Sequence, residues 1–189
     1  GWVGAKAGCF GATIALRRDT LERIGGFLAF RDHLADDHAL GEAVQRLGLG
    51  IALARYVVDD RVQEPGFAHL FQHELRWART VRSIEPLGFA ASAITHPVAL
   101  ALLALPFALL LPWVAACLPV AVLCRVWMIR AVDRALRLAP TPLWLIGIRD
   151  PLSFLVLVLS FCGRTVTWRG GRFRVSRSGK LVPHGDPKR

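Results

Sequence analysis

The sequence lacks any cysteine pattern typical of metal binding or of a disulfide framework. Its four cysteines include no Cys-x-x-Cys pair, and three of them lie in or beside apolar stretches, where a thiol behaves as a small hydrophobic group. We therefore expect neither a zinc site nor disulfides. An initiator methionine and a signal peptide are also missing, and strand-like sequence begins within ten residues. We expect the chain to be truncated at its N-terminus.

Acidic residues are few and unevenly distributed. The 189 residues include 24 Lys and Arg against 14 Asp and Glu, a net charge of +10, yet 53% are hydrophobic. These properties conflict in a small soluble domain unless they are separated along the chain. Nearly all acidic residues lie in 1–85, Leu, Ala, Val and Pro dominate 86–163, and 164–189 is a basic tail. Because the cations flank apolar segments, we expect a membrane partner and no nucleic acid.

The first zone opens with a strand signal followed by a helix signal. Residues 9–16 are short, apolar and compatible with a β-strand. Asp19 then stands at an N-cap position with Glu22 three residues later, as in a capping box, and Gly25 and Gly26 provide a helix stop. We therefore expect a strand leading into a short helix.

Helix and strand signals continue beyond this helix. Apolar residues recur at helical spacing over 37–47, and residues 50–58 have the composition of a second strand. This alternation predicts an α/β layer structure for residues 1–66. Residues 67–84 then predict an amphipathic helix that is rich in Arg and His.

The second zone is apolar enough to enter a membrane. Residues 87–128 contain only His96 and Arg125 as ionisable side chains. That length accommodates two spans of roughly 20 residues each. A third apolar segment, 143–163, is interrupted by Arg149-Asp150-Pro151. We expect two or three membrane segments, with the first turn near Pro112 or Pro119.

The charges beside these segments give conflicting orientations. Arg130, Arg134 and Arg137 place the segment after the second span on the cytoplasmic side, and the basic tail requires the same side. Both hold only if the third segment does not cross fully, or if the spans are miscounted. The number of crossings stays open at this point.

Two adjacent acids, Asp36 and Asp37, stand at the head of the helix predicted over 37–47. A carboxylate there gains from the helix dipole and from unpaired backbone N–H groups, so we assign Asp36 as the helix cap. Two acids exceed what capping needs. Asp37 is therefore a candidate general base that accepts a proton from an attacking hydroxyl.

A second cluster lies on the helix predicted over 67–84. His73, Arg76 and Trp77 are related as i, i+3 and i+4, so they share one face. Arg matches phosphate geometry with two parallel hydrogen bonds, and an aromatic ring stacks on a sugar. Arg and Trp also serve as lipid anchors in interfacial helices, which is the alternative interpretation. His69 and His73 have metal-ligand spacing, but no acidic third ligand lies near them in sequence.

Taken in order, these clusters resemble the membrane-bound GT-A glycosyltransferases of families 2 and 21, most closely the ceramide glucosyltransferase type and the bacterial hopanoid-biosynthesis glycosyltransferases. The resemblance spans almost the whole chain. Its elements are Gly-Cys-Phe-Gly-Ala-Thr-Ile-Ala-Leu-Arg-Arg-Asp from Gly8, Gly-Gly-Phe from Gly25, Leu-Ala-Asp-Asp-His from Leu34, His-x-x-Arg-Trp from His73, the apolar spans, and Trp-Arg-Gly-Gly-Arg-Phe from Trp168.

The resemblance implies an α/β fold plus membrane helices. We expect the C-terminal part of a GT-A, or nucleotide-diphospho-sugar transferase, domain. The expected division is a GT-A part in 1–66, an interfacial helix in 67–85, two to three transmembrane segments in 86–163, and a basic juxtamembrane tail in 164–189.

The resemblance also implies roles for individual residues. Asp37, which closes the acidic pair, corresponds to the catalytic base, and Asp36 stands at a substrate-binding position where many relatives have Glu. Arg76 is expected to bind the nucleotide diphosphate, and Trp77 to face the acceptor. His73 departs from the usual Gln or Arg but still donates a hydrogen bond to phosphate.

Relatives hold uridine and a divalent metal, Mg or Mn, through an upstream Asp and an Asp-x-Asp motif. No Asp-x-Asp occurs in these residues. We therefore expect no metal ligand in this stretch, a metal site upstream in the full-length enzyme, and no activity from this stretch alone.

The implied reaction is inverting transfer of glucose or N-acetylglucosamine from a UDP-sugar to ceramide, a sphingoid lipid or a hopanoid. The expected location is a bacterial inner membrane, with the catalytic face toward the cytoplasm. A processive polysaccharide synthase is the nearest alternative. A non-enzymatic scaffold or transporter subunit is another, in which the acidic pair caps a helix and Arg and Trp anchor lipid. The sequence gives no indication of oligomeric state.

Overall fold

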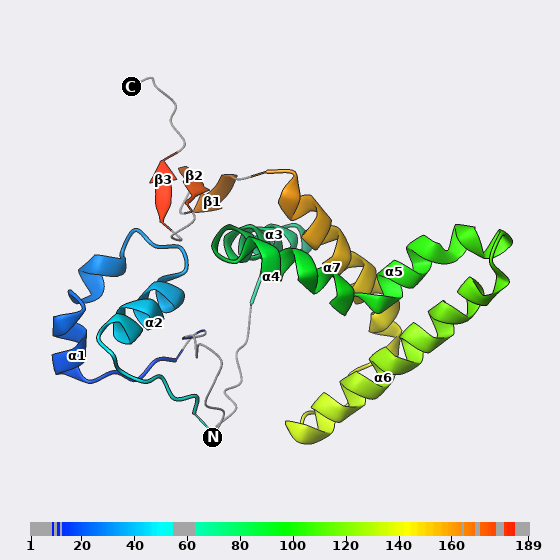
Figure 1. Ribbon diagram of the computed structural model, residues 1–189, viewed down its shortest axis with the longest axis horizontal. Helices are drawn as coiled ribbons and strands as arrows, with labels where there is room; N and C mark the ends of the chain where they lie inside the picture. The colour runs from blue at the N-terminus through cyan, green and yellow to red at the C-terminus, as the bar shows by residue number, and fades with distance from the viewer. Residues whose placement is uncertain are drawn as a thin grey trace. The chain divides into compact units, whose positions relative to one another are not determined.

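The computed structural model describes residues 9, 11, 13–54, 63–163, 165–168, 171–176 and 180–183. The chain divides into two compact units (Figure 1). One, here the split unit, combines residues 1–84 with 164–189; the other, the apolar unit, comprises 85–163. Each is described by itself.

The split unit begins with short helices. They are α1 (Arg18–Arg23), the 3-10 helix η1 (Phe27–Phe30), α2 (Asp36–Arg46) and the longer α3 (Phe67–Ile84). The predicted glycine stop of α1 is confirmed: Gly25 and Gly26 have φ of 93° and 69°, and the Gly26 N–H donates to the carbonyl of Leu21 at 2.8 Å. Glycine adopts this left-handed backbone without steric cost.

Both predicted caps lie one or two residues inside their helices. The N-cap of α1 is Arg17, and Asp19 accepts hydrogen bonds from the Thr20 N–H at 2.9 Å and the Arg17 guanidinium at 3.1 Å. The N-cap of α2 is Ala35, so Asp36 is its first residue and accepts from the Asp37 N–H at 3.0 Å. Each carboxylate still accepts a hydrogen bond from an N–H of the first helical turn. The donor is the next residue in the chain, whereas a capping side chain accepts from the N–H two or three residues later.

The basic tail contains a small antiparallel sheet for which the sequence analysis assigned no strands. Its strands are β1 (Thr165–Trp168), β2 (Gly171–Val175) and β3 (Leu181–Pro183), in the order β1-β2-β3. Val166 pairs with Phe173, and Val166 and Val175 are buried. The alternation of Arg with Phe and Val across 172–175 is typical of a half-buried strand. The tail was interpreted from its positive charge instead, so no strand was predicted there.

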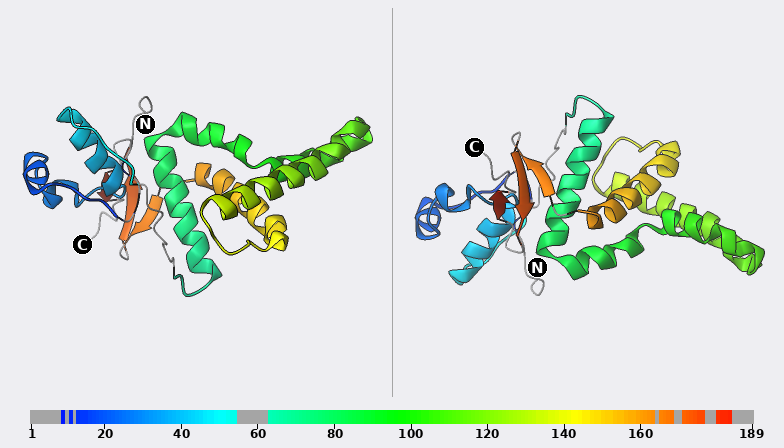
Figure 2. Two further views of the ribbon diagram at one scale, coloured as in Figure 1. Left: turned by 90° about the horizontal axis from the view of Figure 1, so that it is seen from below. Right: turned by 90° about the horizontal axis from the view of Figure 1, so that it is seen from above.

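Helix α3 packs against β1 and β2, and both views in Figure 2 show them side by side. The helix predicted over 67–84 is confirmed with the same bounds. The Arg79 guanidinium donates to the Thr165 carbonyl at 2.8 Å. A second link joins the Leu181 N–H to the Asp32 carbonyl at 2.8 Å. These bonds hold residues from before and after the apolar unit together.

The two strands predicted in the first zone are not found among the described residues. The described positions of the two predictions, 9, 11 and 13–16 of the first and 50–54 of the second, belong to no strand. Positions 10, 12 and 55–58 lie outside the described residues. An extended segment becomes a strand only when a neighbour takes its backbone hydrogen bonds. In the described part, the chain is mostly helical with one small sheet.

The apolar unit is entirely helical in its regular elements. In chain order these are α4 (Pro86–Ala91), η2 (Ser92–Thr95), α5 (Pro97–Ala104), η3 (Leu105–Leu109), η4 (Pro112–Ala116), α6 (Cys117–Ala135), η5 (Leu143–Leu145) and α7 (Ile146–Phe161). Helices α5 and α6 pack along each other, and Val98, Ala101, Ala121 and Ile146 form the core.

Two stretches of this unit are long and apolar enough to cross a membrane, Pro112–Ala135 and Leu143–Phe161. A third is a pair, Pro86–Thr95 and Pro97–Leu109, bent by 70° at His96. The first turn therefore falls at Pro112; Pro119 lies inside α6.

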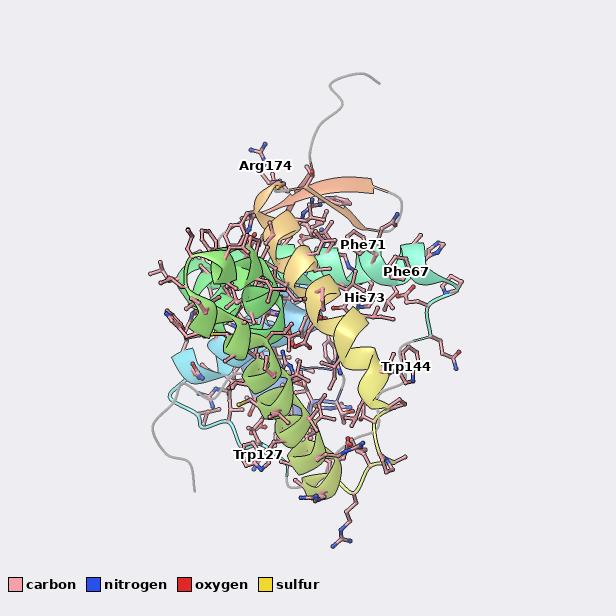
Figure 3. All side chains as sticks on the ribbon, turned by 90° about the vertical axis from the view of Figure 1, so that its right-hand side faces the viewer. Phe67, Phe71, His73, Trp127, Trp144 and Arg174 are labelled. Atoms are coloured by element: carbon pink, nitrogen blue, oxygen red, sulfur yellow. The ribbon has the colours of Figure 1, made fainter. Side chains whose placement is uncertain are left out.

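The expected interruption of the third segment at Arg149-Asp150-Pro151 does not break α7, which continues through it. Large apolar side chains face outward, including Trp127 and Trp144 (Figure 3). Apolar exposure on this scale fits a lipid environment.

Candidate functional site

Asp37 is held at the start of α2 by two backbone groups. Its Oδ2 accepts a hydrogen bond from the Gly11 N–H at 2.9 Å, and its Oδ1 accepts one from the His38 N–H at 2.7 Å. The first bond joins positions 26 residues apart. Each carboxylate oxygen keeps a second acceptor site, so the half-buried side chain is oriented and still able to take a proton.

The segment around Cys9 lies directly against α2 at Gly41. A Cβ added at Gly41 would stand 3.0 Å from the Cys9 nitrogen and 3.2 Å from the Cys9 Cβ. Only glycine leaves room for this approach, which positions Gly11 for its bond to Asp37. Burial, followed by the negative charge of Asp37, raises the pKa of the Cys9 thiol. The thiol therefore stays protonated at neutral pH, and we assign it no nucleophilic role.

Gly41→Ala is expected to destabilise the split unit by about 1–3 kcal/mol, because the new methyl group would stand only 3.0 Å from the Cys9 backbone nitrogen. The variant should lower the thermal midpoint of unfolding and weaken transfer activity, since Gly11 shifts away from Asp37. Gly147→Ala is the matched control: this helical glycine has nothing within 4 Å of the added Cβ. A Gly41→Ala protein as stable as this control would contradict the packing described.

A second candidate site lies along α3, where a hollow of about 380 Å³ opens beside β1. Figure 3 shows His73 on this helix, with Phe67 and Phe71 nearer its start. The hollow is lined mainly by polar side chains. They are Glu64, His69, Gln72, His73, Leu75, Arg76, Arg79 and Val166.

The hollow carries a positive balance of charge. Among the described lining residues, Arg76 and Arg79 stand beside one carboxylate, that of Glu64, whose Oε1 lies 2.8 Å from His73 Nδ1. This contact holds the imidazole and leaves its Nε2 for another partner. Arg79 is fixed through one nitrogen to Thr165, while its buried Nε has no partner in the described structure. Two guanidiniums and two imidazoles suit a phosphate-bearing ligand.

The structure brings some predicted site residues together. His73 and Arg76 share the hollow, whereas Trp77 does not line it and is 65% exposed. Asp36 and Asp37 are not among the lining residues either. The expected convergence of Asp37 with Arg76 and Trp77 stays a prediction.

Several lining residues were not assigned to the site from the sequence, and His69 was weighed only as a metal ligand. Gln72 and Arg79 fall on the same helical face as His69, His73 and Arg76, so extending the i, i+3, i+4 pattern along α3 finds them. Glu64 precedes the helix and Val166 comes from the sheet, and no local pattern identifies either.

Among the described residues, no three His, Cys, Asp or Glu side chains are placed to hold a metal ion. Glu64, His69 and His73 all line the hollow, but they do not form such a group.

Comparison with known proteins identifies the family. The model of glycosyl transferase family 21 matches residues 3–181, which is nearly the whole chain. Searches of curated proteins and of solved structures gave no match. The matched region includes both the Asp37 segment and the α3 hollow. The chain therefore belongs to glycosyl transferase family 21 and is a glycosyltransferase.

Proposed function

We propose that the protein transfers glucose or N-acetylglucosamine from a UDP-sugar to a hydroxyl group of a membrane lipid, such as ceramide, a sphingoid lipid or a hopanoid. The observation that carries the proposal is the cationic hollow on α3, which is followed at once in the chain by an apolar unit. By resemblance, residues 1–66 belong to the C-terminal part of a GT-A domain. The catalytic face is cytoplasmic, in a bacterial inner membrane.

On the donor side, Arg76 and His73 bind the diphosphate. The guanidinium of Arg76 forms paired hydrogen bonds to phosphate oxygens. Nδ1–H of His73 donates to Glu64, so Nε2 donates to the same group when the ring is the doubly protonated imidazolium. Negative charge grows on the diphosphate as its bond to the anomeric carbon breaks. Donors fixed in advance stabilise that charge more than they stabilise the bound ground state.

On the acceptor side, Asp37 is the general base. It takes the proton of the lipid hydroxyl while the oxygen forms a bond to the anomeric carbon and the nucleoside diphosphate leaves with the electron pair of the breaking bond. Attack from the face opposite the leaving group inverts the anomeric configuration. The two backbone N–H groups on Asp37 keep its carboxylate aimed during this step.

Helix α3 is suited to lie at the membrane surface. Its exposed large apolar side chains are Phe67, Leu70, Trp77 and Val81, and none of them lines the hollow. Indole rings favour the headgroup level of a bilayer. Trp77 accordingly contacts the lipid acceptor or its surroundings, while the polar face meets the soluble donor.

The reaction is tested with full-length protein in lipid nanodiscs, given labelled UDP-glucose or UDP-N-acetylglucosamine and each candidate lipid. We expect each lipid that serves as an acceptor to give one labelled glycolipid. NMR should show that its anomeric configuration is inverted relative to that of the donor. A labelled polymer would instead support the processive synthase. Release of free sugar with every lipid would contradict lipid transfer.

Two full crossings are supported by the connectivity. Residues 32 and 79, before the apolar unit, are hydrogen-bonded to residues 181 and 165, after it. A split unit on one side of the bilayer requires the intervening chain to cross an even number of times. The continuous stretches 112–135 and 143–161 are the better spans, so we infer that the pair bent at His96 enters and returns.

This topology places Arg130, Arg134 and Arg137 on the side of the membrane opposite the split unit. The positive-inside rule favours the other side for them. Arg130 is offset by Asp133, 3.3 Å away. Single cysteines in a cysteine-free protein test the assignment with a membrane-impermeant maleimide. We expect Leu111→Cys to react from the same side as Arg174→Cys in the split unit, and Ala139→Cys from the other. If Ala139→Cys reacts from the side of the split unit and Leu111→Cys from the other side, the bent pair crosses the membrane and α7 does not.

A further inference from the structure

The turn between α6 and α7, residues 136–142, is held by one buried carboxylate. Asp133 accepts hydrogen bonds from the Thr141 N–H at 3.0 Å and from the Thr141 hydroxyl at 2.8 Å. Arg130 donates to Asp133 at 3.3 Å and to the Thr141 carbonyl at 3.2 Å. Both charged side chains are therefore occupied within the protein, and they fix the turn to the end of α6.

Two hollows adjoin this turn. The first, here the turn hollow, has a volume of about 360 Å³ and is lined by Arg130, Asp133, Arg134, Arg137, Leu138 and Pro140. The second, here the inner cavity, has a volume of about 260 Å³ and lies between α6, α7 and the bend at His96. Thr141 lines the inner cavity and is hydrogen-bonded to Arg130 and Asp133 of the turn hollow, so the two hollows are neighbours.

The inner cavity has one arginine without a counter-charge. Its described ionisable lining residues are His96, Arg125, Arg149 and Asp150. Arg125 Nε lies 2.6 Å from Asp150 Oδ2, and both side chains are buried, so these two charges cancel. The exposed Arg149 has no ion pair or hydrogen bond among the described residues. The cavity therefore keeps a positive balance.

The turn hollow adds to this positive balance. Arg130 is paired with Asp133, whereas Arg134 and Arg137 have no carboxylate partner in the described part of the chain. Taken together, the described lining residues of the two hollows include five arginines and two aspartates, and both aspartates are paired. This end of the apolar unit therefore presents three arginines that are free to meet an anion.

The position of these arginines suits the headgroup level of a bilayer. Trp144 is 69% exposed at the start of the stretch 143–161, and indole rings favour that level (Figure 3). Arg149 follows five residues later, about 8 Å along the helix, a distance that its long side chain is able to span. The inner cavity also has an apolar wall that includes Ile129, Leu145 and Ile146.

We propose that this end of the apolar unit binds the phosphate headgroup of an anionic membrane lipid. Arg149 contacts the phosphate, because a guanidinium donates paired hydrogen bonds to phosphate oxygens. Arg134 and Arg137 add the positive field that favours an anionic lipid over a zwitterionic one. The apolar wall of the inner cavity accommodates the start of an acyl chain, which favours a lipid over a free phosphate ion.

This inference goes beyond the proposed function and does not depend on it. In the two-crossing topology the site lies on the side of the membrane opposite the split unit, so the bound lipid is not the sugar acceptor. The positive-inside rule disfavours arginines on that side. A bound anionic lipid supplies the negative charge that the two aspartates, already paired, do not.

Photo-crosslinking tests the inference on the full-length protein in phosphatidylcholine nanodiscs. A phosphatidylglycerol with a diazirine near its headgroup is activated, and the labelled peptides are mapped. We expect labelling around Arg149 that excess unlabelled phosphatidylglycerol abolishes and the same amount of phosphatidylethanolamine leaves unchanged. Equal competition by phosphatidylethanolamine would remove the preference for an anionic lipid and overturn the proposal. Competition by inorganic phosphate would assign the site to a soluble anion and overturn it as well.

Variants of Arg149 test the assigned contact. Arg149→Gln should reduce this labelling about fivefold, which corresponds to the roughly 1 kcal/mol that one arginine contributes near anionic lipid. Arg149→Lys keeps the charge and should retain most of the labelling. Arg174→Gln is the matched control, because it removes one charge from an exposed arginine of the split unit, and it should leave the labelling unchanged.

Unaltered labelling of a folded Arg149→Gln protein, or an equal loss in Arg174→Gln, would overturn the proposal. If Arg149→Gln does not fold, the competition experiment on the unmodified protein decides the question.

Discussion

Asp37→Asn is expected to reduce sugar transfer by about 10²–10⁴-fold, the usual contribution of a general base. The amide has nearly the same size as the carboxylate but cannot take the proton of the lipid hydroxyl. The loss should appear mainly in kcat, since Asp37 acts as the acceptor oxygen attacks. Donor KM should change little, because Asp37 does not line the cationic hollow.

The variant also carries a folding cost that must be separated from this effect. Asp37 accepts one backbone N–H at each oxygen, and an Asn amide offers only one oxygen, so one N–H loses its acceptor at a cost of about 1–3 kcal/mol. A thermal melt measures that cost independently. Activity is therefore compared at a temperature where both proteins are fully folded.

Asp36→Asn is the matched control. It changes the adjacent carboxylate, whose described bond is to the Asp37 N–H at 3.0 Å, and a single amide oxygen is able to keep that bond. Because the resemblance places Asp36 at a substrate-binding position, we expect a loss of transfer that is smaller than that of Asp37→Asn. Undiminished activity of Asp37→Asn, or an equal loss in both variants, would remove Asp37 from the role of base.

Local patterns predicted the elements that depend on nearby residues. The apolar periodicity of α3 gave its bounds, and Gly25 with Gly26 gave the end of α1, because both signals lie within a few turns of chain. The i, i+3 spacing of His73 and Arg76 agrees with their placement in one hollow, whereas Trp77, at i+4 from His73, does not line it.

Features that depend on distant residues could not be predicted in this way. Arg79 donates a hydrogen bond to Thr165, which is 86 positions away in the sequence. Thr165 belongs to β1, which is a strand because it pairs with β2 and not because of its local propensity. The contact of Glu64 with His73 depends on how the chain enters α3. Residues 50–54 show the converse, since strand-like composition without a pairing partner did not form a strand among the described residues.

The bend at His96 is caused by Pro97, which the high hydropathy of the segment made easy to overlook. Pro97 lies inside an apolar run that predicted a membrane span, but it removes one N–H donor of the helix, and the residue before a proline is disfavoured in the helical conformation. His96 accordingly has φ of −108° and ψ of 58°. By contrast, Pro151 lies within the continuous helix α7, so proline alone does not predict a break.

Arg76→Ala is expected to reduce transfer by about 10²–10³-fold, comparable to removing a donor that stabilises transition-state charge. The guanidinium lies in the hollow with His73, where the departing diphosphate gains charge. We expect kcat to fall together with a rise in donor KM, because Arg76 binds the diphosphate before and during bond breaking. A rise in KM with kcat unchanged would mean that Arg76 binds the ground state and the transition state equally and does not stabilise the departing diphosphate selectively.

Arg76→Lys separates charge from geometry. The ammonium keeps the positive charge but loses the two parallel hydrogen bonds, so activity should lie between those of the unmodified protein and Arg76→Ala. Arg82→Ala is the control, because Arg82 lies on α3 but does not line the hollow, and transfer should change only a few-fold. Equal losses in Arg76→Ala and Arg82→Ala would indicate general disruption of α3 or of its membrane contact, and would remove the diphosphate from this hollow.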